Sequence, residues 1–209
     1  MINLILYSVS EVLELKKKYF LAGIISLILF GILLPQPVQA LFVYSPMKSF
    51  FTNHSIILCV LVGIVQAVSE ECGYYFVMKR IYNRENNSIL PFWFGLGRGI
   101  VHTIFDIGSV ILIMTSLISG ISAVVSRLLG LGALIQLTNL DYIAFRNRKI
   151  GFIIMSVIFH FIMNSVIYAN ELDLLHLSDT IFIFVYSGVV IIFSSLLIKF
   201  NSVSDSKQL

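Results

Sequence analysis

The chain has 209 residues, of which 58% are hydrophobic and only 12% are charged, and its formal net charge is +3. Because a water-soluble domain is about 45–50% apolar and about 25% charged, this composition excludes a soluble monomer and a disordered chain. The small net charge gives no indication of nucleic-acid binding. Long continuous apolar runs predict an all-α fold, a polytopic transmembrane helical bundle, since a β-barrel would show short alternating segments.

Six segments are apolar and long enough to cross a bilayer, which takes about 20 helical residues. They are residues 19–34, 55–78, 91–118, 122–145, 150–168 and 180–198. Pro35 and Pro37 are expected to end the first span. Residues 1–15 are too short for a full span and are expected to form an N-terminal interfacial helix. No linker divides the chain, so residues 1–209 are expected to form one membrane-embedded domain.

The positions of the cations predict the orientation of the spans. With six spans and both termini in the cytoplasm, eleven of the fourteen Lys and Arg residues fall on the cytoplasmic side. The positive-inside rule favours this arrangement. It also supports residues 122–145 as a span, because five spans would move Arg146, Arg148 and Lys149 to the opposite side. We therefore expect a multi-pass protein of a bacterial cytoplasmic membrane.

Two of the predicted spans carry charged residues far from their ends, where such side chains are costly and often functional. Glu70 and Glu71 are adjacent in the second span. Arg98, His102 and Asp106 are spaced four apart in the third span, which places them on one face of a helix.

The fifth predicted span adds His160 and Asn164, which are also four residues apart. At 1.5 Å per residue, the ionisable residues of these three spans lie roughly 10–16 Å from the cytoplasmic helix ends. The residues in this layer are Glu71, Arg98, His102 and His160. We expect a polar site in the cytoplasmic half of the membrane.

The same residues allow other interpretations. An ion pair between Glu and Arg can serve only to hold two helices together. A layer of ionisable groups can also act as a proton or ion relay. Gly95 and Gly99 form a small-xxx-small pattern, which favours close helix packing, although glycines there could instead loosen the helix and admit water.

Three motifs resemble a known superfamily when taken in order. They are SEECGYY at residues 69–75, FGLGRGIVH at residues 94–102 and HFIMN at residues 160–164. The set resembles the glutamic intramembrane proteases of the CAAX-protease and bacteriocin-immunity (CPBP or Abi) superfamily. It is most similar to the YhfC-type branch, which also shares the run KKKYFLAGIISLILF. The resemblance covers about residues 16–170 and implies an intramembrane protease.

The resemblance also implies roles for individual residues. Glu70 and Glu71 match the paired glutamates, so Glu70 would activate the attacking water and Glu71 would support it. His160 and Asn164 match the last motif and would polarise the scissile carbonyl and bind its oxyanion. His102 would take the place of a family histidine from the next helical turn.

The chain departs from the family pattern at two positions. Tyr74 stands where the family has Arg, and Arg98 stands where the family has His. Arg98 would then neutralise a glutamate, and Asp106 would orient His102; the alternative is a degenerate site. The site-supporting residues of this interpretation are Arg98, Asp106 and Tyr74.

The favoured function is therefore a glutamic intramembrane endopeptidase that cleaves a membrane-associated protein or peptide with a Glu-activated water. No cofactor is expected, although a Glu, His, His set could also hold zinc with an open position. The expected partners are the substrate and the lipid bilayer, and no nucleic acid. The alternatives are a catalytically degenerate binding or immunity protein on the same scaffold, and a small transporter or relay subunit.

Overall fold

The computed structural model describes residues 2–44, 46, 48–81, 89–113, 117–171, 174–175 and 178–206. Within these ranges, side chains are described except at residues 2–13, 43, 89, 105–113, 117–123, 126–127, 171, 179–180, 183, 194 and 197–206. The described part of the chain contains helices and no strand. The all-α prediction is therefore confirmed for these residues.

Nine helical elements follow one another along the described chain. They are α1 (Ile2–Ser26), the π-helix η1 (Leu27–Leu33), α2 (Pro35–Tyr44), α3 (Lys48–Asn53), α4 (Ser55–Ile81), α5 (Ile89–Ile113), α6 (Leu117–Asn147), α7 (Gly151–Glu171) and α8 (Asp179–Ser206). Each of the last five begins within about five residues of a predicted span.

Four helical stretches among the described residues are long and apolar enough to cross a membrane. They are Glu14–Phe42, Ser55–Ile81, Leu128–Asn147 and Gly151–Asn170. Helices α5 and α8 match the third and sixth predicted spans in position, but their side chains are described only in part. A multi-pass membrane protein is supported, while the total of six spans and the cytoplasmic termini stay predictions.

Two expectations for the N-terminal region need correction. Residues 2–15 are helical, but they form the first part of the continuous helix α1 and are not a separate interfacial helix. Pro35 and Pro37 follow the end of η1 at Leu33, as expected, but they also lie in the first turn of α2, so the apolar helical stretch continues to Phe42. Backbone N–H groups in a first turn have no intrahelical acceptor, so proline is tolerated there.

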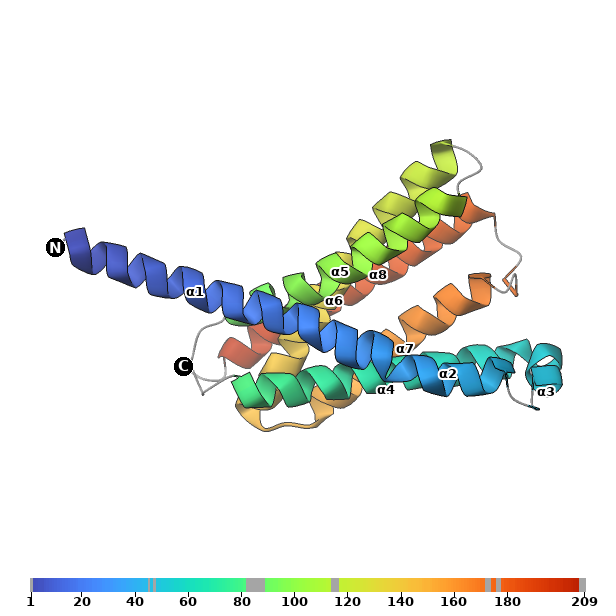
Figure 1. Cartoon of the computed structure of the whole chain (residues 1–209), viewed down its shortest axis with the longest axis horizontal. Coiled ribbons are helices and arrows are strands. Elements are labelled where there is room, and N and C mark those ends of the chain that lie inside the picture. Colours follow the sequence, from blue (N-terminus) through green and yellow to red (C-terminus); the bar gives the residue numbers. More distant parts are fainter. Residues whose placement is uncertain are drawn as a thin grey trace.

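The helices form a bundle in which α6 contacts four others, namely α4, α5, α7 and α8. Figure 1 shows α5, α6 and α8 running side by side, with α4 and α7 diverging from them and α1 crossing the bundle. The N-terminal end of α1 extends away from the other helices (Figure 1). Helix α1 packs along α5, which brings the first and third predicted spans together.

The main buried cluster lies between α1, α4, α5 and α6. Its members are Tyr19, Ala22, Leu27, Tyr74, Met78, Leu90, Phe94 and Tyr142. Many large apolar side chains are exposed elsewhere, Ile56 and Ile154 among them. Because a soluble protein rarely leaves so many apolar side chains in contact with water, these faces fit contact with lipid.

Glycines allow α5 to approach two neighbouring helices. A Cβ atom on Gly97 would lie 2.1 Å from the backbone oxygen of Phe20 in α1. A Cβ atom on Gly99 would lie 2.2 Å from Leu131 in α6, and one on Gly95 would lie 3.0 Å from the Cα of Ile135. Helix α5 continues unbroken through this segment, so the close-packing interpretation of the glycines is confirmed.

The π-helix η1 follows α1 in the chain and is joined to α4 by hydrogen bonds. Ser69 Oγ donates a hydrogen bond to the Phe30 carbonyl at 2.7 Å, and Gln66 Nε2 donates to the Gly31 carbonyl at 2.8 Å. Such π-helical segments are often found at functional sites. Here the carbonyls of η1 fix the side chains of Gln66 and Ser69, which lie four residues and one residue before Glu70 in the sequence.

The Gly97 contact gives a test of this packing. We expect Gly97→Ala to lower stability by about 1–3 kcal/mol, because its Cβ would overlap a backbone atom that cannot rotate away. Gly132→Ala is the matched control, since its Cβ would meet nothing within 4 Å. The thermal unfolding midpoint in detergent measures both variants, and equal midpoints would contradict the proposed α1–α5 contact.

Candidate active site

Glu71 lies at the centre of a buried polar cluster formed by three helices. Its Oε1 forms an ion pair with Nη2 of Arg98 on α5 and accepts a 2.5 Å hydrogen bond from Nδ1 of His160 on α7. Its Oε2 accepts a 2.7 Å hydrogen bond from Oγ of Ser156. Because a carboxylate only accepts hydrogen bonds, His160 carries a proton on Nδ1.

Glu70 is buried beside Glu71 but has different partners. Gln66 Nε2 donates to its Oε1, and the hydroxyl of Tyr74 donates to its Oε2 at 2.8 Å. Two further groups lie just outside hydrogen-bond range of the same Oε2. These are Arg98 Nη2 at 3.6 Å and His160 Nε2 at 3.8 Å.

Arg98 is the only guanidinium that the structure describes inside this cluster, and it is fully buried. Its Cζ lies 3.6 Å from the centre of the Tyr74 ring, a cation–π distance, and its Nη1 donates to Thr138 Oγ1 at 3.3 Å. Arg98 therefore partly balances the charges of Glu70 and Glu71. The structure shows the expected contact between Arg98 and a glutamate, while the function of this ion pair stays a prediction.

Sequence reasoning missed Asp141, which is also fully buried beside this cluster. The charges of Glu71 and Arg98 both act on its carboxyl group. A signal was present in the sequence, since Thr138 and Asp141 are three residues apart on one apolar helix.

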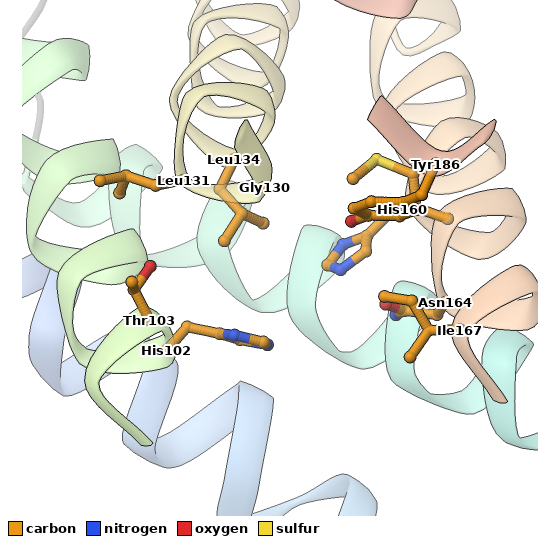
Figure 2. A pocket seen from close by; sticks show the side chains of 10 residues that line it. His102, Thr103, Gly130, Leu131, Leu134, His160, Asn164, Ile167 and Tyr186 are labelled. Atoms are coloured by element: carbon orange, nitrogen blue, oxygen red, sulfur yellow. The ribbon is translucent and has the colours of Figure 1, made fainter. Parts of the chain in front are cut away.

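A small pocket adjoins the cluster between α5, α6, α7 and α8. It is lined by His102, Thr103, Gly130, Leu131, Leu134, His160, Met163, Asn164, Ile167 and Tyr186 (Figure 2). Its volume is about 30 Å³, enough for one or two water molecules. Figure 2 shows the His102 side chain extending from α5 toward the side of the pocket formed by His160 and Asn164.

All five predicted catalytic residues thus lie in the cluster or along the pocket. Glu70 and Glu71 belong to the cluster, His102 and Asn164 line the pocket, and His160 belongs to both. The predicted supporting residues Arg98 and Tyr74 contact the glutamates. The backbone of Asp106 lies in α5, but its side chain falls outside the described residues.

Asn164 has an unusual position in the pocket. Its Nδ2 is buried and has no hydrogen-bond partner among the residues that the structure describes. A buried donor without a partner costs free energy and calls for an explanation. A donor directed at a developing oxyanion is one such explanation.

The ion pair gives a second prediction. We expect Arg98→Ala to destabilise the protein by about 3–5 kcal/mol, because it leaves the buried Glu70 and Glu71 without their permanent counter-charge. Arg80→Ala is the matched control, because Arg80 is exposed at the end of α4. Unfolding in detergent, followed by circular dichroism, measures the loss of stability of each variant. An equally small loss for both variants would contradict a large contribution of the Arg98 ion pair to stability.

Comparison with known proteins gives one match. Residues 2–123 match the model of a family described as YhfC intramembrane metalloprotease. The matched part includes Glu70, Glu71, Arg98 and His102, whereas His160 and Asn164 lie beyond it. No curated protein and no solved structure matches the chain.

Proposed function

The chain belongs to the YhfC intramembrane metalloprotease family. We propose that it is an intramembrane endopeptidase, as this family membership suggests, and that it is of the glutamic type, as the paired glutamates of its site suggest. It would hydrolyse peptide bonds of a membrane-associated protein or peptide. The observation that carries the proposal is the contact between a carboxylate pair and a water-sized pocket. His160 provides that contact, because it touches Glu71 and also lines the pocket.

In the proposed reaction, a water molecule in the pocket attacks the scissile carbonyl. Glu71 holds the imidazole of His160 by its Nδ1–H, so Nε2 is the nitrogen that can take a proton from the water. The Oε2 of Glu70 lies 3.8 Å from this Nε2 and stabilises the imidazolium that forms. In this arrangement His160 accepts the proton from the water, whereas the sequence analysis expected Glu70 to accept it directly. Glu70 stabilises the protonated ring, and Glu71 sets its orientation.

The pocket also supplies the groups that a tetrahedral intermediate requires. The unpartnered Nδ2 of Asn164 is the proposed donor to the oxyanion. His102 lies on the opposite side of the pocket (Figure 2), where it would protonate the leaving amine. This arrangement uses all five predicted catalytic residues.

The family description names a metal, but the donor atoms of this site do not fit one. The four carboxylate oxygens of Glu70 and Glu71 already accept hydrogen bonds or ion pairs from protein groups. Among the described residues, no group of three His, Cys, Asp or Glu side chains could hold a metal ion. The proposed mechanism therefore has no step that uses a metal.

A second candidate is a catalytically degenerate binding or immunity protein on the same scaffold. Its support is the number of protein partners of Glu71, which include Arg98, Ser156 and His160. A carboxylate whose two oxygens both accept hydrogen bonds from protein groups is suited to a structural role. In this alternative the cluster only joins α4, α5 and α7.

The proposed setting is a bacterial cytoplasmic membrane, with the site in its cytoplasmic half. This follows from the cation distribution of the sequence together with the several apolar helices. Substrates would then reach the pocket from the bilayer or from the cytoplasmic surface.

The principal test is Glu70→Gln. We expect it to abolish cleavage while the protein still accumulates, because glutamine keeps the size of the side chain and removes its negative charge. New peptide termini in membranes from cells that express wild-type or variant protein at equal levels measure the effect. Termini found only with the wild type would support proteolysis and identify a substrate.

Glu14→Gln is the matched control, because Glu14 is exposed on α1. It should leave the set of termini unchanged. Identical termini for wild type and a folded Glu70→Gln variant would contradict the protease and support the degenerate scaffold. An ion flux in liposomes that Glu70→Gln removes would instead support the relay subunit.

The oxyanion role of Asn164 gives a separate prediction. We expect Asn164→Leu to lower the cleavage rate by about 10²–10³-fold, the usual loss for one oxyanion donor. Stability should change little, because the Nδ2 atom has no hydrogen-bond partner among the described residues. Asn170→Leu near the end of α7 is the control, and equal cleavage by both variants would exclude this role for Asn164.

A further inference from the structure

The guanidinium of Arg98 lies among three side chains that commonly bind zinc. Its Nη2 contacts Glu71 Oε1, lies 3.6 Å from Glu70 Oε2 and lies 3.4 Å from His160 Nδ1. Carboxylates and imidazoles are both zinc ligands, but among the described residues Glu70, Glu71 and His160 do not by themselves form a group that could hold a metal ion. In this chain, the positive charge at their centre belongs to the protein.

The side chain of Arg98 is also fixed at this position. It is fully buried, with its guanidinium against the Tyr74 ring at 3.6 Å and its Nη1 bonded to Thr138. An arginine stays protonated at every accessible pH, so its charge is permanent. A divalent cation brought to the same carboxylates would meet this charge at short range, where repulsion is strong.

The donor atoms near Arg98 are already used. Glu71 Oε2 accepts from Ser156, and its Oε1 accepts from His160 and Arg98. The two oxygens of Glu70 accept from Gln66 and Tyr74. A metal could enter only by displacing several of these bonds together.

We infer that the Arg98 guanidinium occupies the position of a divalent metal ion and makes this chain a metal-independent member of a family described as metalloproteases. Arg98 is then a positioning residue, because it holds Glu70 and Glu71 in place as a metal ion would. Replacing Arg98 by a histidine would place a second imidazole beside Glu71 and His160, and two histidines with one glutamate are a usual zinc ligand set. This inference concerns the proposed active site but does not depend on its being proteolytic.

Zinc binding by the purified full-length protein tests the inference. The wild type is incubated with Zn²⁺ in detergent and dialysed, and the zinc content per chain is measured by mass spectrometry. We expect substoichiometric zinc in the wild type and no change in its thermal midpoint on adding Zn²⁺. About one zinc ion per chain in the wild type, lost in Glu71→Gln, would overturn the inference.

The variant Arg98→His tests the converse. We expect it to bind about one zinc ion per chain and to regain thermal stability with Zn²⁺, because imidazole is a zinc ligand and the fixed charge is gone. Arg80→His is the matched control at an exposed position and should bind no stoichiometric zinc. A folded Arg98→His that binds no zinc would contradict the inference.

The wild-type measurement decides the question even if Arg98→His does not fold. Zinc content is also independent of peptide cleavage. A metal-free wild type that produces no new termini would leave this inference standing while the protease proposal fails. A zinc-bound wild type that cleaves peptides would overturn this inference and the metal-free mechanism, while intramembrane proteolysis itself would stand.

Discussion

The ion pair between Arg98 and Glu71 is the interaction on which this structure depends. Charged side chains inside a membrane are costly unless they are paired, and these two are fully buried in an otherwise apolar bundle. The pair joins α4 to α5, and His160 and Ser156 extend it to α7. Hydrophobic attraction cannot hold helices together in lipid, so polar contacts and close glycine packing do this work. Stability and chemistry therefore rely on the same few side chains.

Much of the fold could be predicted from composition and pattern. Long apolar runs marked the main helices because a bilayer fixes their length, and the small-xxx-small pattern of Gly95 and Gly99 correctly predicted close packing. The prolines misled in part, because the same residue type ends a helix or begins one, depending on its position in the turn. The π-helix could not be predicted, since it depends on acceptors for Gln66 and Ser69 that only the packed bundle provides.

The site was predicted in outline because ionisable residues are rare in membrane helices. Helical spacing placed His160 and Asn164 on one face, and both line the pocket. The hydrogen-bond partners of the glutamates could not be predicted, because residues distant in sequence come into contact only after the helices pack. Asp141 was missed for this reason: its spacing from Thr138 indicated a shared helix face, but not that this face packs against Glu71 and Arg98. The family description alone suggests a metal, whereas the surroundings of Arg98 argue for a different source of positive charge.

The long sequence separation within the cluster has a consequence for biogenesis. Arg98 follows Glu71 by 27 residues and His160 follows it by 89. At about 5–20 residues per second of synthesis, α4 is complete roughly 4–16 s before His160 is made. During this interval its two glutamates have no partner from α7, and lipid is an unfavourable environment for them. The polar cluster therefore makes the stable insertion of α4 depend on the later arrival of α5 and α7.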